Sequence, residues 1–237
     1  MKKLLSLLLI LTIFPLHLYA DNEMVAVWGG FGRGDNVYSC AETDEKIIAL
    51  TFDDGPHPRY TEEILDILDK YTVKATFFVI GKNAESYPKM LKRIADAGHE
   101  IGNHTYSHVT AGRSTKVNFK AELEKTDSII KKITGKDTVL FRPPTGYCNE
   151  TAVKSAAEMN YKIIVWTVDT RDWAHTESGN IIKTVTNQVT GGSIILFHDY
   201  VSAPSPTPNA LNEIIPYLTA QGYRFVTVSE LLSYDSI

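Results

Sequence analysis

The strongest constraint on the fold is a regular alternation of short apolar runs and longer amphipathic stretches that begins at Lys46. The apolar runs have the length of buried strands: Ile47–Phe52, Ala75–Ile80, Glu100–Asn103, Val139–Arg142, Ile163–Val168, Ser193–His198 and Arg224–Val228. The stretches that follow them have helical length and spacing: Thr61–Tyr71, Ser86–Ala97, Lys120–Thr134, Glu150–Asn160, Asn180–Val189, Asn209–Ala220 and a short final helix near Glu230–Leu232. Such alternation predicts parallel strands joined by crossover helices.

The length of the chain agrees with one α/β domain. The chain has 237 residues, and seven strand–helix units within residues 46–237 predict a distorted (β/α)7 barrel, TIM-barrel-like and imperfectly closed. A doubly wound open sheet is the alternative, but no glycine-rich phosphate loop follows the first strand. The preferences of the residue types place a helix N-cap at Thr61 and helix C-termini at Gly98 and Gly135.

Two N-terminal segments are expected to lie outside this domain. Residues 1–20 combine a basic start with an apolar core, which is typical of a secretory signal peptide cleaved after Ala20. A retained anchor is the alternative. Residues 21–45 show little periodicity and are expected to form an irregular lead-in. We therefore expect an exported protein, secreted or associated with the cell envelope, and we expect it to be a monomer.

The net charge narrows the classes of molecule that the protein could bind, and the two cysteines raise the question of a disulfide. The formal net charge is −4 at pH 7, which argues against nucleic acid or an anionic membrane as the partner. A neutral or weakly charged polymer fits better. Export would permit a disulfide between Cys40 and Cys148. Their positions, before the first strand and after the fourth, disfavour one, because about a strand's length separates them.

Two adjacent carboxylates, Asp53 and Asp54, end the first apolar run and precede a Gly55-Pro56 break. Neighbouring residues on a strand point to opposite faces, so both side chains can serve one site only if the backbone bends at the end of the strand. One carboxylate would then bind a metal while the other handles a proton. The alternative interpretation is a polar strand cap before a turn.

Polar side chains also follow other expected strands, at the ends that share one rim in parallel βα folds. They are His104 and His108 after the third strand, Arg142 at the end of the fourth, Asp169 and Asp172 after the fifth, and His198 and Asp199 at the end of the sixth. Histidines four residues apart lie on one face of a helical turn and can reach one ion; two surface or capping histidines are the alternative. Asp54 would complete a face of two histidines and one carboxylate with open positions.

Five ordered segments resemble the five motifs of the polysaccharide deacetylase family, the NodB-homology domain of carbohydrate esterase family 4. They are Thr51-Phe52-Asp53-Asp54-Gly55-Pro56, His104-Thr105-Tyr106-Ser107-His108, Arg142-Pro143-Pro144, Asp169-Thr170-Arg171-Asp172-Trp173 and Ile195-Leu196-Phe197-His198-Asp199. The resemblance spans about residues 47–232, and five motifs in this order are highly specific. It implies a catalytic domain that acts on a polysaccharide.

The resemblance also implies a role for each rim residue. Asp54, His104 and His108 would bind a divalent metal, usually zinc, with cobalt or another ion as the alternative. Asp53 would be the general base that deprotonates the metal-bound water. A cation bound there would lower the pKa of its water to about 7, which makes hydroxide available at neutral pH.

The remaining motif residues would support this chemistry. Arg142 would keep Asp53 ionised, because a neighbouring guanidinium lowers the pKa of a carboxyl. His198 would be the general acid that protonates the departing amine, and Asp172 would orient it and raise its pKa. Trp173 and Leu196 would form the wall of the pocket for the acetyl methyl group.

One position departs from the family pattern. The third motif usually continues with an aromatic residue, but this chain has Thr145 there, with Tyr147 two places later. The backbone N–H of Thr145 can still donate to an oxyanion, whereas an aromatic wall for a sugar ring is lost. The change therefore affects substrate shape or affinity more than catalysis.

These observations predict an exported, metal-dependent hydrolase that removes N-acetyl groups from N-acetylglucosamine-type residues of a polysaccharide, with peptidoglycan the expected polymer or chitooligosaccharide in its place. An O-acetyl xylan esterase with the same site is one alternative. A carbohydrate-binding module without turnover is another, and the complete residue set argues against it. A structural zinc is disfavoured, because it would take a fourth protein ligand.

Overall fold

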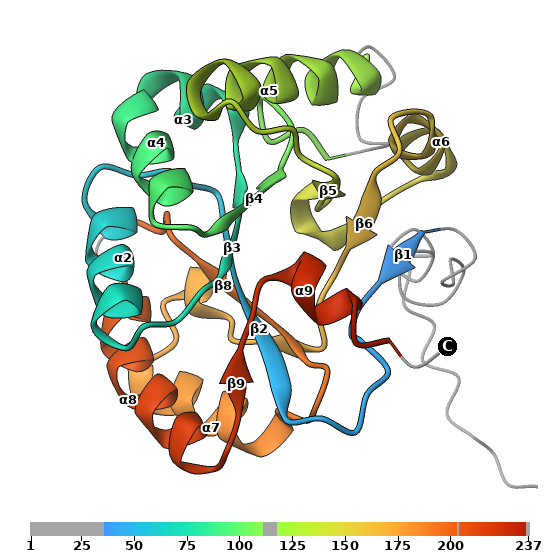
Figure 1. Cartoon of the computed structure of the whole chain (residues 1–237). Coiled ribbons are helices and arrows are strands. Elements are labelled where there is room, and N and C mark those ends of the chain that lie inside the picture. Colours follow the sequence, from blue (N-terminus) through green and yellow to red (C-terminus); the bar gives the residue numbers. More distant parts are fainter. Residues whose placement is uncertain (1–35, 111–117, 203, 236–237) are drawn as a thin grey trace, which may run out of the picture.

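The computed structural model describes residues 36–110, 118–202 and 204–235 (Figure 1). The expected signal peptide, residues 1–20, and most of the expected lead-in, residues 21–45, lie outside the described residues. None of the helices in the described part of the chain has the length and apolar character that a membrane crossing requires.

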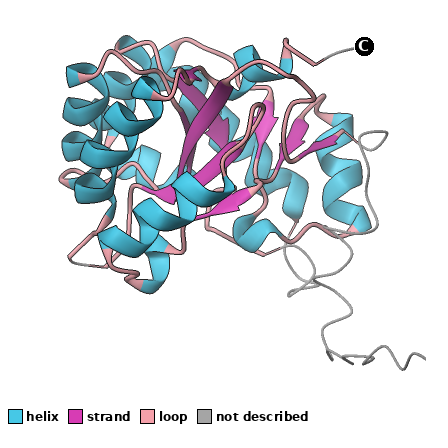
Figure 2. Cartoon of the chain, turned by 90° about the horizontal axis from the view of Figure 1, so that it is seen from below, coloured by secondary structure: helices cyan, strands magenta, loops and turns pink. Residues whose placement is uncertain are grey.

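The strands form one curled parallel sheet with helices around its outside (Figure 1 and Figure 2). The strand order is β1-β6-β5-β4-β3-β2-β8-β7, and β9 pairs with the start of β2. The strands are β1 (Val37–Tyr38), β2 (Ile47–Asp53), β3 (Thr76–Val79), β4 (Glu100–Asn103), β5 (Leu140–Phe141), β6 (Lys162–Ile164), β7 (Val168–Asp169), β8 (Ile194–His198) and β9 (Arg224–Phe225). The prediction of a distorted α/β barrel is confirmed, in the form of a curled half-barrel.

The run Ile163–Val168, expected to be one strand, forms two. Strand β6 pairs with β5, whereas β7 pairs with β8 on the other side of the curled sheet. The three residues between them cross from one side to the other: Val165 N–H donates to Tyr38, and Thr167 N–H donates to Ile194. One continuous ladder cannot pair with two separated strands, so the segment spans the point where the barrel is imperfectly closed.

The last part of the expected lead-in is regular. Strand β1 pairs in parallel with β6, and Cys40 makes an isolated antiparallel bridge with Ser193. The expectation of an irregular segment is therefore wrong at Val37–Tyr38, where two residues are too few to give a periodic sequence signal. Cys40 and Cys148 form no disulfide in the structure.

The helices follow the strands in the expected order, with one addition. They are α2 (Tyr60–Lys70), α3 (Gly81–Ser86), α4 (Pro88–Asp96), α5 (Phe119–Thr134), α6 (Glu150–Glu158), α7 (Ser178–Gln188), α8 (Thr207–Ala220) and α9 (Val228–Leu232). The expected helix Ser86–Ala97 corresponds to α4, which begins two residues later, and a separate helix, α3, precedes it, with Tyr87 between the two at φ −125° and ψ 56°. The break falls there because a proline, here Pro88, disfavours the helical conformation in the residue before it.

Two expected helix ends are confirmed and one is wrong. Gly135 ends α5 at φ 74°, and Gly98 follows α4 at φ 78°. Thr61 is not the N-cap of α2, because the helix begins at Tyr60. The Thr61 hydroxyl is used elsewhere: it accepts the N–H of His57 and donates to a carboxylate oxygen of Asp199, at 2.7 and 2.6 Å.

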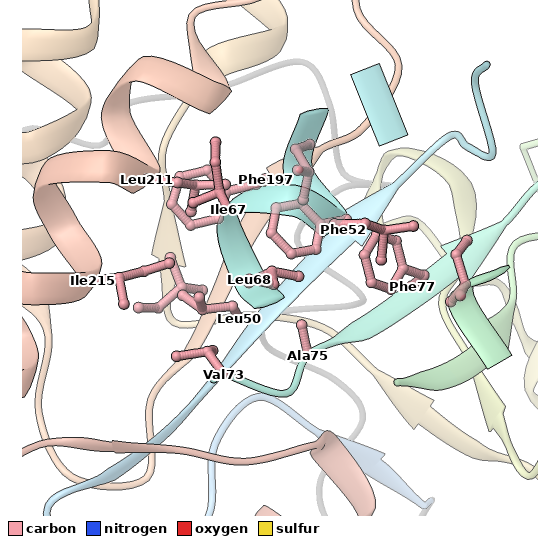
Figure 3. Packing of buried hydrophobic residues seen from close by; sticks show 14 of the residues in the cluster. Leu50, Phe52, Ile67, Leu68, Val73, Ala75, Phe77, Phe197, Leu211 and Ile215 are labelled. Carbon is pink, nitrogen blue, oxygen red and sulfur yellow. The ribbon is translucent and has the colours of Figure 1, made fainter. Parts of the chain in front are cut away.

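Alternate residues of β2 face two different cores. Ile48, Leu50 and Phe52 pack outward against the helices, and Figure 3 shows Phe52 between Phe77 and Phe197 in this layer. Ile47 and Ala49 belong to the second core, inside the curl of the sheet. By this two-residue period, Thr51 and Asp53 also point inward. The strand therefore carries a carboxylate to the inner face at its carboxyl end.

The two ends of the half-barrel differ. At the amino ends of the strands, α9 lies over the opening: Val228 N–H donates to the hydroxyl of Thr76 and Ser229 N–H to the carboxylate of Glu100, at 2.9 and 3.0 Å. A capping box between Thr227 and Glu230 fixes the start of that helix. The carboxyl ends of the strands, at the opposite rim, carry the polar side chains that the motifs contain.

Candidate active site

Asp53 and Asp54 both serve the rim because the backbone turns between them. Asp53 is the last residue of β2 and is 3% exposed. Asp54 has a φ of 77°, in the left-handed region, and its carbonyl accepts a 2.7 Å hydrogen bond from the side-chain amide of Asn83. The bend that the sequence required for a shared site is therefore present, and Asn83 on α3 holds it.

His104 and His108 do not lie on a helical turn, and the expectation of one is wrong. Both are in the loop after β4, where Thr105 has a φ of 65° and His108 a φ of 57°. The loop is held by backbone hydrogen bonds to the neighbouring segment, in which Gly81 N–H donates to the Thr105 carbonyl at 2.9 Å. These left-handed residues bring the two rings together, with centroids 5.1 Å apart, without helical periodicity.

A hydrogen bond fixes the tautomer of His104. Its Nδ1 lies 2.7 Å from the backbone oxygen of Arg142. A carbonyl can only accept, so Nδ1 carries a hydrogen, and in the neutral ring Nε2 presents a lone pair. Metal-ligating histidines have this arrangement, with one ring nitrogen bonded to a carbonyl and the other aimed at the ion.

The residues Asp54, His104 and His108 fit a divalent metal. Their ligand atoms lie within 4.8 Å of one another, and Oδ1 of Asp54 is 3.4 Å from Nε2 of His104 and 3.2 Å from Nε2 of His108. Ligand atoms of a tetrahedral zinc, each about 2.0–2.2 Å from the ion, lie about 3.4 Å apart. Oδ1 of Asp54 is buried and has no hydrogen-bond partner among the described residues, as expected of an atom whose partner is a cation.

Charge and burial agree with this fit. The described residues offer three protein ligands at this cluster, which leaves positions for water and substrate, as in catalytic rather than structural sites. Burial raises the pKa of Asp54, but the two histidines outweigh it and hold this pKa well below its usual range. The same contact raises the pKa of His108. The role of the three side chains as ligands stays a prediction.

Asp53 is paired with Arg142 beside this cluster. Nη1 of Arg142 donates to Oδ1 of Asp53 and to the Thr51 hydroxyl, both at 2.8 Å. The guanidinium is fully buried, and its other nitrogens donate to the carbonyls of Ile164 and Val165. Oδ2 of Asp53 lies 3.8 Å from Nε2 of His104. One oxygen of Asp53 is thus held by arginine, while the other faces the ligand cluster.

His198 and Asp172 form the second acid–base pair. Oδ1 of Asp172 accepts from Nδ1 of His198 at 2.8 Å, and its Oδ2 accepts from the His198 backbone N–H at 2.8 Å and from the Thr207 hydroxyl at 2.6 Å. Burial lowers the pKa of His198, but Asp172 outweighs it, the charges of Asp53 and Asp54 add to the effect, and the pKa rises to about 9. This shift favours the protonated form of His198 at neutral pH.

A polar network behind His104 anchors its loop to α5. Nδ2 of Asn103 lies 2.9 Å from the Leu123 carbonyl, from Oδ1 of Asp127 and from the Tyr161 hydroxyl, so its two N–H groups are shared among three acceptors. Its own oxygen accepts the N–H of Thr105 at 2.8 Å. All the hydrogen-bonding groups of this buried amide are satisfied, which specifies one position for the loop.

The remaining expected site residues follow the same strands. Trp173 comes directly after Asp172 and is 51% exposed, which favours a contact surface over the core. Leu196 is buried on β8, two residues before His198 and on the same face of the strand. Thr145 is exposed, in the short 3-10 segment Pro144–Gly146, at φ 63°. Their roles as pocket walls and oxyanion donor stay predictions.

Three supporting residues had no assigned role in the sequence reading. Asn83 holds the Asp54 carbonyl, Thr207 donates to Asp172, and Asp199 lies against Gly55. Burial raises the pKa of Asp199 to about 7, with the charges of Asp54 and Asp53 adding and the Thr61 and Gly55 hydrogen bonds opposing. The position of Asp199 directly after His198 in the sequence indicated that Asp199 lies on the same rim. No local pattern indicates Asn83 or Thr207.

Comparison with known proteins agrees with this site. The family model described as polysaccharide deacetylase matches residues 41–164. A peptidoglycan-N-acetylglucosamine deacetylase of Bacillus cereus is 44% identical over 193 residues, which cover 81% of this chain and 90% of that protein.

Two solved structures extend the match to three dimensions. The Bc1960 peptidoglycan N-acetylglucosamine deacetylase superposes with a TM-score of 0.81 at 38% identity, over 85% of this chain and 94% of the other. A family 4 acetyl xylan esterase from Clostridium thermocellum, solved with a cobalt ion, gives a TM-score of 0.73 at 38% identity, over 79% of this chain and 91% of the other.

Proposed function

Since this chain belongs to the polysaccharide deacetylase family, we propose that it hydrolyses the N-acetyl groups of N-acetylglucosamine-type residues in peptidoglycan. The observation that carries the proposal is the arrangement of one rim, where Asp53 stands beside the cluster of Asp54, His104 and His108. The 44% identity to a peptidoglycan-N-acetylglucosamine deacetylase supports the choice of polymer.

The ligand cluster would hold a divalent cation, with zinc the proposed ion and cobalt the alternative that the esterase structure supports. Bound there, such a cation supplies Lewis acidity, which polarises a carbonyl oxygen and lowers the pKa of water. The protein contributes two histidine nitrogens and one carboxylate, and the bond from His104 Nδ1 to the Arg142 carbonyl orients the first of them.

Asp53 would act as the general base. Arg142 binds its Oδ1 at 2.8 Å, which favours the ionised carboxylate. Oδ2 remains directed at the ligand cluster and would accept a proton from the attacking water. Because the pair is buried, its charges interact in a low dielectric, and Asp53 keeps one orientation before the substrate arrives.

His198 would act as the general acid. Its Nδ1–H is held by Asp172, so the proton that it can release is the one on Nε2. Transfer of that proton to the amide nitrogen, as the bond from the acetyl carbon to nitrogen breaks, releases an amine and acetate. An amide needs this step because an unprotonated amine is a poor leaving group.

We also propose that the protein is exported, with residues 1–20 as the signal peptide, and that it acts as a monomer. A polymer of the cell wall is met outside the cytoplasm, so the proposed substrate and the sequence of residues 1–20 point to the same compartment. Detection of the protein in the culture medium or envelope fraction, with Asp21 as its first residue, tests this.

Acetate release tests the activity. The purified protein is incubated with peptidoglycan, chitooligosaccharide and acetylated xylan, with Asp53→Ala and His104→Ala as inactive variants and Lys92→Ala, on the exposed surface of α4, as the control. Peptidoglycan should give the most acetate, and both site variants should give none. Full activity in either site variant would refute the scheme.

O-deacetylation of xylan is the second candidate, favoured by the fold match to an acetyl xylan esterase. An ester leaves more easily than an amide and depends less on an acid. His198→Ala should therefore reduce amide hydrolysis by about 10²–10⁴-fold and ester hydrolysis by less. The esterase would be favoured by two results together: His198→Ala hydrolyses acetylated xylan as fast as wild type does, and wild type turns over xylan faster than peptidoglycan.

A further inference from the structure

A stack of aromatic rings lies on the rim beside the proposed catalytic residues and has no part in the mechanism above. His57 is nearly parallel to Tyr200, with centroids 5.0 Å apart and planes at 21°, and it meets Tyr87 edge-on at 6.4 Å. The three residues follow β2, β8 and β3, which are neighbours in the sheet. Three separate loops thus bring their rings to one place.

The central ring is held in one orientation. Nδ1 of His57 accepts the backbone N–H groups of Arg59 and Tyr60, both at 3.2 Å. Its ring also stacks on the buried Tyr60, with centroids 5.1 Å apart. Because Nδ1 is an acceptor, the hydrogen of the neutral ring is on Nε2, which remains able to donate to a ligand. Burial, with the charge of Arg59, lowers the pKa of His57, which favours this neutral form.

The outer rings are exposed. Tyr200 is 46% exposed and Tyr87 is 38% exposed, and no hydrogen bond found among the described residues uses either hydroxyl. Tyr217 on α8, at 49% exposure, provides a contrast, because no ring contact of it is found in the same part of the chain. Grouped exposed aromatic rings indicate a binding surface, whereas single ones are ordinary.

The aromatic stack lies close to the proposed reaction site. His57 is the third residue after Asp54, and Tyr200 is the second after His198. Consecutive Cα atoms lie about 3.8 Å apart, so Tyr200 starts within about 8 Å of His198. A polymer bound with one sugar at Asp53 and His198 would therefore reach the stack with a neighbouring sugar. Trp173, after β7, continues the same sector of the rim.

We propose that His57, Tyr87 and Tyr200 form a subsite for a second, non-reacting sugar of the glycan chain. The apolar C–H face of a pyranose ring would pack on Tyr200, and its hydroxyls would bind the tyrosine hydroxyls and Nε2 of His57. This inference rests on the proposed function, because it takes the reacting sugar to lie at Asp53. The three rings would also supply an aromatic surface for a sugar, which Thr145 does not provide.

Chain-length dependence tests the subsite. kcat/KM is measured on chitooligosaccharides of two and five sugars for wild type, Tyr200→Ala, Tyr200→Phe and the control Tyr217→Ala. Tyr200→Ala should lower the ratio of pentamer to dimer kcat/KM by about 3- to 10-fold, the loss of one aromatic contact, mainly through KM. Tyr200→Phe should keep most of the preference, and Tyr217→Ala all of it.

Binding separates this inference from the proposed function. If wild type releases no acetate, the function fails, and the subsite is then tested by calorimetric titration of the pentamer into wild type, Tyr200→Ala and Tyr217→Ala. Weaker binding by Tyr200→Ala alone supports the subsite. Equal losses on dimer and pentamer, or binding by Tyr200→Ala equal to that of Tyr217→Ala, would overturn it. Thermal unfolding establishes that each variant is folded.

Discussion

Asp53 and Arg142 form an ion pair in the interior of the protein, with Nη1 2.8 Å from Oδ1 and the guanidinium fully buried. Burial alone lowers the pKa of Arg142, and the charge of Asp53 opposes this change. Each charge therefore depends on the other. Hydrogen bonds from the guanidinium to Thr51, Ile164 and Val165 complete its shell. The pair links three strands, so its disruption should affect both folding and chemistry.

Arg142→Gln should lower the free energy of unfolding by about 3–5 kcal/mol, because it leaves the Asp53 charge buried without a partner. kcat/KM should fall by about 10²-fold or more, since Asp53 loses the hydrogen bond that orients it as the general base. Urea unfolding and acetate release measure the two effects. Arg93→Gln is the control: its ion pairs with Glu62 and Asp66 are on the surface, so stability should change by about 1 kcal/mol or less. Wild-type stability in Arg142→Gln would contradict this.

Zinc should stabilise the protein through the ligand cluster. At a concentration about 100 times its Kd, a ligand that binds only the folded state adds about 2.7 kcal/mol to the free energy of unfolding. His108→Ala should lose this gain. His108 suits the test better than His104 because its side chain is 38% exposed against 2%, so its removal disturbs packing less. Thermal unfolding with zinc, and again after a chelator, measures the effect. His175→Ala should respond as wild type does; an undiminished response in His108→Ala would assign zinc to another site.

The rim could be predicted from the sequence because its positions depend on short-range rules. The period of two along β2 puts Asp53 on the inner face, and parallel strands bring their carboxyl ends to one edge. Asp53 and His198, at the ends of β2 and β8, needed only those two rules and the strand boundaries, whereas the motif indicated Asp172, three residues after β7. Asp54 was expected to join His104 and His108 as a ligand from this placement on the rim, and the motifs imply the same set; their role as ligands stays a prediction.

The parts that could not be predicted depend on backbone conformation or on distant partners. The left-handed residues Thr105 and His108 replace a helical turn, and no periodicity reports such a loop. The split of β6 from β7 depends on where the sheet stops closing. Thr61 has the residue type of an N-cap, but a contact with Asp199, 138 residues away, decides its role. Tertiary contacts of this kind override local preference.

Gly55→Ala should remove activity through a steric effect. A Cβ at Gly55 would lie 2.0 Å from Oδ2 of Asp199, whose side chain is buried and held by Thr61. Either the carboxylate or the backbone of the Asp54 turn must shift, so acetate release and zinc stabilisation should both fall, with a stability loss of about 1–3 kcal/mol. Asp199→Ala in the same chain should restore part of the zinc response, because it removes the clash.

Gly179→Ala is the matched control for that substitution. Gly179 lies in the first turn of α7, and a Cβ there would meet no atom within 4 Å. Alanine should leave activity unchanged and raise stability by up to about 1 kcal/mol, because it favours the helix. Equal effects of the two substitutions would show that loss of chain flexibility, and not the contact with Asp199, is responsible.

His99 should make stability depend on pH below neutrality. Its side chain is 4% exposed, and its Nδ1 accepts the backbone N–H of Ala75 at 3.2 Å. Burial lowers its pKa from 6.5 to about 4, with the charge of Lys74 adding and that of Asp69 opposing. Above pH 6.5 the ring is neutral in both states and its contribution is complete. As the pH falls from 6.5 towards 4, the unfolded chain binds a proton that the folded protein does not, so stability is lost in this window.

The size of this loss follows from the pKa of His99 in the unfolded chain, 6.5, and in the folded protein, about 4. Between pH 7.5 and 5.5, wild type should lose about 1.3 kcal/mol through His99. His99→Asn keeps an acceptor for the Ala75 N–H but cannot titrate. Its free energy of unfolding should therefore fall by about 1.3 kcal/mol less than that of wild type over the same pH interval. His175→Asn, at an exposed histidine, should behave as wild type. Urea unfolding of the three proteins at both pH values measures the difference, and equal pH dependence in wild type and His99→Asn would show that His99 is not its source.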